Sequence, residues 1–402
     1  MKILSIDDAK QFANKSPNRK VVIITGVTGQ DGSFMVDYLL KNTPHVIFGG
    51  ARRLSVANHE NIAHLEHEGR FHLINFDLTD AHSISQTISQ LQPDYFINFA
   101  AQSFVKSSWD FPAQTWDTNT TSLIHILESI RLHCPDCRFY NAGSSEEFGD
   151  VAYSPQDEKH PLRPRSPYGA SKAAARQLVK VYRESYSLYA VQGWLFNHEG
   201  IRRGEEFVTR KITKAVAKIK KAIDYRTKSG LSGFDSLEPL ELGNVDAKRD
   251  WSDAEDMVDA VWRMMNQENY REDMKNLPKG GILISPPKFI RSCLVPHLRE
   301  YVVANGETHS IREFVELSFS HAGINGKWYM TDNDPLSERY VLTNSDGTTD
   351  GVSIVTINSA YYRPAEVEHL HGNAKQIVAD LGWNPKTSFI ELVKKMTLND
   401  LK

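Results

Sequence analysis

Three glycines, Gly26, Gly29 and Gly32, follow the apolar, β-branched run Val21–Thr25 and precede a helical pattern over residues 30–41. Glycines between a strand and a helix let the backbone turn tightly and approach a pyrophosphate, whose charge then lies at the helix N-terminus. A plain glycine-rich turn is the alternative, but the strand–turn–helix context favours the binding motif. We therefore expect the chain to begin with a dinucleotide-binding βαβ unit.

Apolar runs and amphipathic stretches alternate through the first half of the chain. Apolar runs at 45–49, 71–76, 95–100 and 138–142 alternate with helical patterns at 81–91 and 114–132, and a helix over 168–186 precedes a strand over 188–196. This order is typical of βαβ units with helices on both faces of the sheet. We predict an α/β fold with a Rossmann-like doubly wound parallel sheet.

The alternation ends after Asn197, where basic and polar loops begin. A chain of 402 residues is long enough for two domains or one enlarged α/β unit. The apolar run 300–304 precedes another helical pattern and suggests a late return to the sheet. We predict a dinucleotide-binding domain over residues 1–197 with return segments near 249–267 and 300–304. A smaller, interleaved C-terminal substrate domain is expected over 198–402.

Composition restricts the partners. The formal net charge of −3 provides no overall attraction to nucleic acid or to an anionic membrane. No apolar run approaches the ~20 residues of a membrane helix, and residues 1–20 lack the apolar segment of a signal peptide. Three cysteines argue against a disulfide framework; Cys134 and Cys137, with His133 and Cys293, are more typical of reduced thiols than of a zinc site. We expect a cytoplasmic protein with a small-molecule partner, no nucleic acid, no membrane and no metal.

Tyr168 and Lys172 are four residues apart and therefore lie on one face of the predicted helix. A lysine beside a tyrosine lowers the pKa of the phenol, so Tyr168 can take a proton from an alcohol while hydride leaves for a nicotinamide. Ser144 follows the strand at 138–142 and adds a hydroxyl. Glu146 adds a carboxylate that lets such a pocket eliminate water. A packing role for Tyr168 and a surface or helix-capping role for Glu146 are the alternatives.

Arg52 and Arg53 follow the second predicted strand, about 20 residues past the last glycine. An acidic residue in this region binds the ribose 2′-hydroxyl of NAD, whereas guanidinium groups suit a 2′-phosphate. The pair therefore favours NADP, although two solvated surface arginines are the alternative. Asp77 and Leu78, after the next strand, are expected near the adenine.

Eight sequence blocks carry a resemblance to a known family: GVTGQDGS, AAQSFVKSSW, SSEEFG, RSPYGASK, LFNHEGIRRG, FVTRKI, LGNVDAKRDW and YYRPAEVEHL. Together they resemble the GDP-mannose 4,6-dehydratases, which are extended short-chain dehydrogenases/reductases. The resemblance extends from about Lys20 to the C-terminus, with insertions near 225–238 and 270–299. The later blocks are far more specific than the glycine motif.

The resemblance implies an NADP-dependent hydro-lyase that converts GDP-D-mannose to GDP-4-dehydro-6-deoxy-D-mannose, a precursor of fucose-type deoxy sugars. C4 is oxidised, water is eliminated across C5 and C6, and the hydride returns to C6. Glu146 matches the base that takes the C5 proton and then assists departure of the C6 hydroxyl. Ser144 occupies a position usually held by threonine, and Ser145 matches the family serine. The segment matching 53–65 forms subunit contacts in the family, which implies a homodimer or homotetramer.

The glycine motif and the resemblance together predict two sets of binding residues, although each charged member could instead be a solvated surface charge. The predicted cofactor-binding residues are Gly26, Thr28, Gly29, Gln30, Asp31, Gly32, Arg52, Arg53, Asp77, Leu78, Ala100, Gln102, Tyr168, Lys172, Asn197, His198 and Arg203. The predicted substrate-binding residues are Ser103, Ser145, Glu146, Asn197, Val208, Lys211, Arg249, Arg363 and Glu366.

The chain departs from the family pattern at several positions expected near the hexose. Phe104 replaces histidine, Ser144 replaces threonine, Glu147-Phe148 replaces Leu-Tyr, and Gly200-Ile201 replaces Ser-Pro. These differences leave open a related substrate such as a GDP-manno-heptose. An NDP-sugar 4-epimerase is a second alternative, but an epimerase needs no C5 base and Glu146 argues against it. A catalytically silent NADP-binding protein is a third, and the intact Ser144, Glu146, Tyr168 and Lys172 argue against that one.

Overall fold

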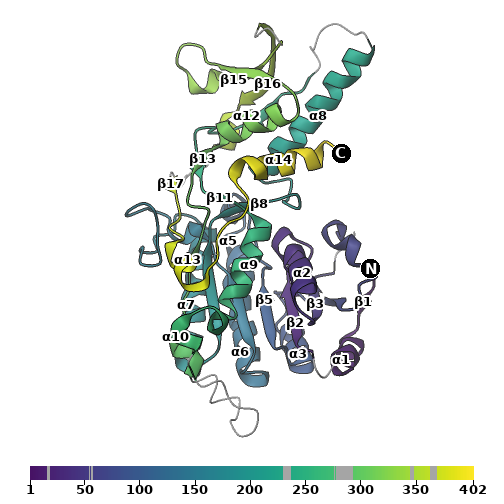
Figure 1. Ribbon diagram of the computed structural model, residues 1–402, viewed down its shortest axis with the longest axis vertical. Coiled ribbons are helices and arrows are strands. Elements are labelled where there is room, and N and C mark those ends of the chain that lie inside the picture. The colour runs from purple at the N-terminus through teal and green to yellow at the C-terminus, as the bar shows by residue number, and fades with distance from the viewer. Residues whose placement is uncertain are drawn as a thin grey trace.

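An eight-stranded, fully parallel sheet forms the larger region of the computed structural model (Figure 1). The structure describes residues 1–15, 19–53, 55, 58–229, 237–275, 277, 293–344, 348–362 and 369–402. The strands lie in the order β1 (Ile3–Leu4), β4 (Phe71–Asn75), β3 (Val46–Ala51), β2 (Val21–Thr25), β5 (Tyr95–Asn98), β6 (Arg138–Ala142), β7 (Ala190–Leu195) and β12 (Val302–Val303). The six strands from β4 to β7 have the 3-2-1-4-5-6 order of a doubly wound sheet, which confirms the predicted Rossmann-like fold.

Helices cover both faces of this sheet and create two separate cores. On one face lie α2 (Gln30–Asn42) and α9 (Ala254–Met264), and on the other lie α3 (Ala81–Leu91), α6 (Ser122–His133) and α7 (Pro167–Tyr186). Val22 and Ile24 of β2 pack into the first core, and Val21 and Ile23 pack into the second. Because successive strand residues point to opposite faces, a strand covered on both sides is apolar throughout. Each such side chain contributes roughly 1.5–3 kcal/mol of burial free energy.

Two parts of the large region differ from the sequence-based expectation. The helix predicted over 114–132 is divided into α5 (Pro112–Trp116), a π-helical turn (Asp117–Thr121) and α6. At the N-terminus, β1 and α1 (Ile6–Asn14) extend the sheet beside β4. A two-residue strand carries no recognisable periodicity, so the sequence did not predict it.

The second region lies beyond the carboxyl ends of the large sheet's strands (Figure 1). It contains α8 (Val208–Ser229), α12 (Ile311–His321), α14 (Phe389–Asp400) and a sheet ordered β14 (Gly326–Tyr329), β15 (Arg339–Thr343), β16 (Thr349–Ile357) and β9 (Leu240–Leu242). Its core includes Trp251, which stacks on Phe389 with ring centroids 5.7 Å apart. Trp251 begins β11 (Trp251–Asp253), which pairs with β8 (Asn197–Glu199). The β8–β11 pair thereby joins the two regions next to the end of β7.

Short elements complete the described chain. A third small sheet has the order β13 (His309–Ser310), β10 (Lys248–Arg249) and β17 (His369–Leu370). The remaining helical segments are η1 (Glu60–Leu65), α4 (Ser107–Asp110), η3 (Ser145–Glu147), η4 (Gln267–Asn269), α10 (Glu272–Lys275), η5 (Val295–His297), η6 (Pro335–Ser337), η7 (Ser359–Tyr361) and α13 (Lys375–Leu381). Of the two predicted insertions, residues 230–236, 276 and 278–292 lie outside the described part of the chain.

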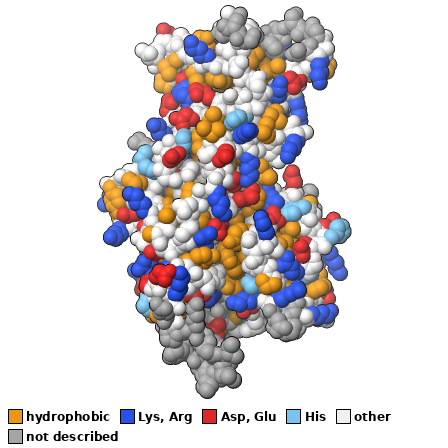
Figure 2. Space-filling model, in the orientation of Figure 1, with side chains coloured by type: hydrophobic (Ala, Val, Ile, Leu, Met, Phe, Trp, Pro, Cys, Tyr) orange, Lys and Arg blue, Asp and Glu red, His pale blue; other side chains and the backbone are white. Residues whose placement is uncertain are grey.

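Basic and acidic side chains are interspersed over the face shown in Figure 2, in keeping with the small net charge. Lys and Arg side chains of α8 line one edge of the second region. None of the described helices combines the length and the apolar character needed to cross a membrane.

Candidate active site

The glycine turn brings three backbone segments into close contact. Gly26 has φ +68°, and a Cβ atom built there would lie 2.8 Å from the nitrogen of Ala100. A Cβ atom at Gly32 would lie 2.3 Å from the carbonyl oxygen of Gly26. Gly29 precedes α2 and has no side chain to cap it, so the helix N-terminus is accessible to an anionic group. The turn is therefore shaped as the sequence predicts for a pyrophosphate site.

Replacing Gly32 with alanine is expected to lower the free energy of unfolding by about 1–3 kcal/mol, because the new methyl group meets backbone atoms that cannot move aside alone. Gly69→Ala is the matched control, since a Cβ atom at Gly69 meets nothing within 4 Å. Denaturant unfolding of both variants measures the difference. Equal stability of the two variants would contradict the assigned packing of the turn.

A continuous cavity of about 1290 Å³ lies at the carboxyl ends of β2, β5, β6 and β7 and extends to the second region. It exceeds the roughly 300–1,000 Å³ of a site for one drug-sized ligand. The predicted residues that line it are Gly26, Thr28, Gly29, Gln30, Asp31, Gly32, Arg52, Asp77, Leu78, Ala100, Gln102, Ser103, Ser144, Ser145, Glu146, Tyr168, Lys172, Asn197, His198, Arg203, Val208, Lys211 and Arg249.

Three predicted binding residues are not among them. Arg53 is exposed and does not line the cavity, although its neighbour Arg52 does. The two follow directly on β3, and consecutive side chains leaving a strand tend to point to opposite sides, so only one of the pair is expected to face a given ligand. Arg363 and Glu366 lie outside the described residues.

An Asp31–His198 pair links the first turn of α2 to β8. His198 Nε2 lies 2.9 Å from Asp31 Oδ2, and its Nδ1 lies 2.7 Å from the carbonyl oxygen of Phe196. Burial alone would raise the pKa of Asp31, but the charge and hydrogen bond of His198 outweigh it, so the pKa is lowered. Burial likewise opposes the charged form of His198, yet Asp31 raises the histidine pKa. The pair is thus stabilised in its ionised form beside the cavity.

The four predicted catalytic residues converge from two elements. Ser144 caps the turn η3 with its Oγ, which accepts from the backbone nitrogen of Glu146 at 3.2 Å, and it also hydrogen-bonds to Tyr168. Tyr168 lies in the first turn of α7. Lys172 Nζ donates to the carbonyl oxygen of Ala142 at 2.8 Å and lies 5.8 Å from the centroid of the Tyr168 ring. Glu146 is half-buried and lines the same cavity. A hydroxyl, a phenol, an ammonium and a carboxylate therefore share one pocket.

The ionisation of Tyr168 differs from the sequence-based expectation. Burial raises the pKa of the phenol above its ordinary value, the Ser144 hydrogen bond opposes this, and the carboxylates of Glu146 and Glu147 raise it further. Burial also lowers the pKa of Lys172 to about 8, against the neighbouring charge of Glu147. The sequence predicts that Lys172 lowers the phenol pKa, whereas in the structure burial of Tyr168 has the largest effect and Lys172 is itself desolvated and donates to Ala142.

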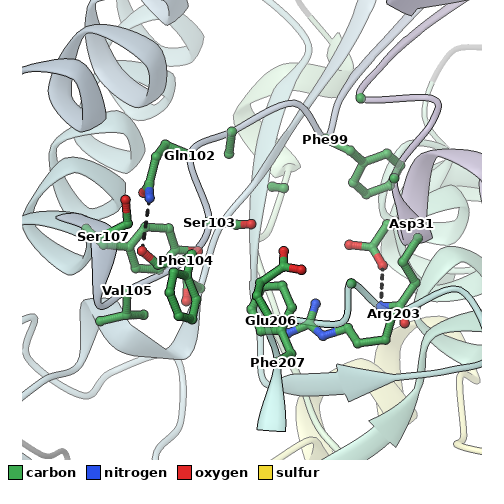
Figure 3. A pocket seen from close by; sticks show the side chains of 18 of the residues that line it. Asp31, Phe99, Gln102, Ser103, Phe104, Val105, Ser107, Arg203, Glu206 and Phe207 are labelled. Carbon is green, nitrogen blue, oxygen red and sulfur yellow. Dashed lines mark hydrogen bonds between the residues drawn. The ribbon is translucent and has the colours of Figure 1, made fainter. Parts of the chain in front are cut away.

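Aromatic and basic side chains line the outer part of the cavity. The Arg203 guanidinium lies 3.5 Å from the centroid of the Phe207 ring, and Phe207 meets Phe104 edge-on at 5.8 Å (Figure 3). Lys211 Nζ lies 3.7 Å from the ring centroid of Tyr361. Lys106, from the large region, approaches the same ring at 6.0 Å and donates to Ala360 at 3.4 Å. Tyr361 therefore contacts lysines from both regions of the molecule.

Among the residues near the cavity that the sequence analysis missed, Asn119, Arg202 and Asn61 make specific polar contacts. Asn119, in the π-helical turn, donates to the carbonyl of Gln102 and to Ser171 Oγ, both at 3.0 Å, and accepts from the nitrogen of Gln102 at 2.9 Å. Arg202 lines the cavity and pairs with Asp37 at 2.7 Å. Asn61 donates to the carbonyl of Thr28 at 3.0 Å. The arginine doublet in HEGIRRG was a signal for Arg202, whereas a single asparagine offers none.

Known proteins resemble the chain over nearly its whole length. A family described as GDP-mannose 4,6 dehydratase matches residues 23–277 and 290–396. A GDP-mannose 4,6 dehydratase of Drosophila melanogaster is 39% identical over 392 residues, which cover 95% of this chain and 86% of that protein.

Two solved structures resemble the fold at lower identity. RMD from Pseudomonas aeruginosa, complexed with NADPH, has a TM-score of 0.65 at 19% identity and covers 95% of this chain and 99% of that one. A dTDP-glucose 4,6-dehydratase from Bacillus anthracis, in complex with NAD, has a TM-score of 0.66 at 17% identity and covers 94% and 96%. The full-length match and the cavity that holds Ser144, Glu146, Tyr168 and Lys172 show that the chain belongs to the GDP-mannose 4,6-dehydratase family.

Proposed function

We propose that this protein converts GDP-D-mannose to GDP-4-dehydro-6-deoxy-D-mannose and water, with Ser144, Glu146, Tyr168 and Lys172 as its catalytic residues. The observation that carries this proposal is the position of Glu146 in the same cavity as the other three. Oxidation of an alcohol needs no such carboxylate, whereas elimination of water needs a base for the C5 proton. The family match supports the same reaction.

The residues of the chain divide the proton transfers between them. Tyr168 takes the proton of the C4 hydroxyl, and Ser144, its hydrogen-bond partner, donates to the C4 oxygen. A bound nicotinamide dinucleotide would supply the acceptor for the C4 hydride and the donor of that hydride to C6. Once C4 is a carbonyl the C5 proton is acidic, and Glu146 removes it. Glu146 then protonates the departing C6 hydroxyl. When hydride adds to C6, C5 regains a proton, which is balanced by the proton that Tyr168 took from the C4 hydroxyl, so one water is lost without net oxidation.

A nicotinamide dinucleotide fits the residues of the inner cavity. The close backbone approach at Gly26 and Gly32 and the accessible N-terminus of α2 suit a pyrophosphate. NADP is favoured over NAD because Arg52 lines the cavity just beyond β3, where it can pair with a 2′-phosphate. Asp77 and Leu78, beyond β4, are proposed for the adenine side.

Replacing Arg52 with alanine is expected to weaken NADP binding about 10- to 100-fold, the equivalent of one lost charge-assisted hydrogen-bonding partner. NAD binding is expected to change little. Arg53→Ala is the matched control, because Arg53 does not line the cavity. Isothermal titration with NADP and with NAD measures both effects. An equal loss for the two cofactors, or a larger NADP defect in Arg53→Ala, would exclude Arg52 as the 2′-phosphate contact.

The GDP moiety is assigned to the outer part of the cavity. Arg203, Lys211 and the buried Arg249 supply positive charge for a diphosphate, and Asn197 and Val208 complete this lining. Arg363 and Glu366 are proposed to contribute from their segment. The homodimer or homotetramer and the cytoplasmic location suggested by the sequence stay predictions.

Mass spectrometry of GDP-mannose incubated with the purified protein and NADP tests the function. Loss of one water with the nucleotide retained is the expected result. An unchanged mass with an altered sugar configuration would indicate a 4-epimerase instead. Dehydration of a GDP-manno-heptose in preference to GDP-mannose, in the same assay, would assign the alternative substrate.

A further inference from the structure

A row of buried polar side chains crosses the centre of the large sheet. Thr25, Asn98, Asn141 and Gln192 lie on β2, β5, β6 and β7, and each is directly opposite the next in the strand register. All four are buried. We call these four residues the polar row.

Hydrogen bonds run along the polar row in one direction. Thr25 Oγ1 donates to Asn98 Oδ1 at 2.5 Å, Asn98 Nδ2 to Asn141 Oδ1 at 2.8 Å, and Asn141 Nδ2 to Gln192 Oε1 at 2.6 Å. Gln192 Nε2 then donates to Glu147 Oε1 at 3.0 Å. Aligned hydrogen bonds in a low-dielectric interior polarise one another, so an anionic acceptor at the end strengthens the whole row.

Glu147 is fully buried and is surrounded by donors. Its Oε1 accepts from the backbone nitrogen of Ser144 at 2.9 Å, and its Oε2 accepts from Arg176 Nε at 2.5 Å. Burial raises the pKa of Glu147, whereas the donors that surround its carboxylate, Arg176, the Ser144 nitrogen and Gln192, oppose that rise and favour the ionised form. A leucine is usual at this position in the family that the sequence resembles. The buried Glu147–Arg176 ion pair therefore lies directly behind the Ser144–Glu146 turn.

Arg176 connects this ion pair to the rest of the fold. It lies one turn beyond Lys172 on α7, and its Nη1 donates to the carbonyl of Gln192 at 2.7 Å and to Glu300 Oε2 at 2.9 Å. Gln192 also donates to the carbonyl of Lys172 at 3.1 Å. Neither Glu147 nor Arg176 lines the cavity. Both catalytic elements, the Ser144 turn and the Lys172 helix, are thus bonded to one buried group of side chains.

We propose that Glu147 is a positioning residue, which, with Arg176 and the polar row, sets the Ser144–Glu146 turn relative to Tyr168 and Lys172. A buried ion pair contributes little net stability compared with a well-packed apolar pair. We therefore assign the Glu147–Arg176 pair the role of positioning the turn. The Ser144 backbone nitrogen is bonded to Glu147, and this bond orients the hydroxyl that meets Tyr168. The inference rests on the proposed function only for its kinetic readout.

The test compares a charge-removing variant with an apolar replacement of the pair. In Glu147→Gln, an amide NH2 group replaces one oxygen and cannot accept from both Ser144 and Arg176. In Glu147→Leu/Arg176→Leu both charges of the pair are removed together. Glu300, which loses Arg176 as a partner, still accepts a hydrogen bond from Arg183 Nη1 at 2.9 Å. Glu268→Gln is the control, because Glu268 forms a partly buried pair with Arg138 at 2.7 Å away from the cavity.

Both Glu147 variants are expected to lower kcat for dehydration about 10- to 100-fold with little change in KM, as for a misplaced catalytic group. The double variant is expected to unfold close to the wild-type temperature, and Glu268→Gln is expected to keep wild-type kcat. A double variant with normal kcat, or a kcat loss that merely follows the loss of folded protein, would overturn the proposal.

Crystal structures of the wild type and the double variant provide a readout that needs no substrate. The expected result is a displaced Ser144 and loss of its hydrogen bond to Tyr168. An unmoved turn would reject the positioning role whatever the substrate. If the wild type fails to dehydrate any GDP-sugar while the turn still moves, the proposed function is rejected and the positioning role is retained.

Discussion

Replacing Glu146 with glutamine is expected to lower kcat for dehydration of GDP-mannose about 10²- to 10⁴-fold, the usual contribution of a general base. The amide has nearly the same shape but cannot accept the C5 proton, and Glu146 lies half-buried on the cavity wall, where the exchange should leave the fold intact. KM for GDP-mannose is expected to change little, because the side chain acts on the reacting carbon and not on the nucleotide.

Two measurements separate this effect from general damage. In heavy water the wild type is expected to introduce deuterium at C5 of the product during turnover. Glu146→Gln is expected to form product too slowly for this labelling to be detected. Glu206→Gln is the control, because Glu206 is another carboxylate on the same cavity wall (Figure 3). Full turnover by Glu146→Gln, or an equal loss in Glu206→Gln, would reject Glu146 as the C5 base.

Replacing Lys172 with methionine is expected to lower kcat by a comparable factor of about 10²–10⁴, because it removes the cation next to Tyr168. The pH dependence provides the sharper test. Burial lowers the pKa of Lys172 from 10.5 to about 8, so the wild type is expected to lose kcat/KM as the pH rises through about 8. Arginine remains charged, so Lys172→Arg is expected to keep part of the activity and lose this alkaline limb.

The contribution of Lys172 to folding stability is expected to change in the opposite direction over the same pH range. Because the folded pKa of Lys172 lies below its unfolded value of 10.5, the folded state binds fewer protons than the unfolded state between about pH 8 and 10.5. The contribution of this group to folding stability therefore rises with pH while activity falls. Parallel denaturant unfolding and kinetic profiles measure both. If stability and activity both fall above pH 8, the alkaline loss of activity is caused by unfolding and not by deprotonation of Lys172.

The helix predicted over 114–132 shows where reasoning from periodicity reaches its limit. Amphipathic spacing identifies such a helix but does not specify the added residue per turn in the π-helical segment. That turn carries Asn119, whose partners Gln102 and Ser171 lie on segments 17 and 52 residues away. The interruption therefore depends on contacts that form only when β5, α6 and α7 assemble.

The ionisation of the active site shows the same limit. Spacing alone places Tyr168 and Lys172 on one face of a helix, and chemistry alone makes their pairing useful. Burial then acts on each group separately and raises the pKa of Tyr168 while lowering that of Lys172. Desolvation depends on the complete surroundings of a side chain, which a local motif does not contain.

The sequence by itself determined the sheet and the glycine turn, and it predicted the four residues Ser144, Glu146, Tyr168 and Lys172 that line one cavity. Alternating apolar and amphipathic runs have only a few stable arrangements, and glycines at 26 and 32 are required by backbone contacts closer than any Cβ atom tolerates. Only the tertiary structure decided that the Glu147 carboxylate accepts hydrogen bonds from Ser144, Gln192 and Arg176. Those three donors come from a turn, a strand and a helix. Whether a glutamate is buried among such donors or exposed at the surface depends on the burial and the strand register that bring these segments together.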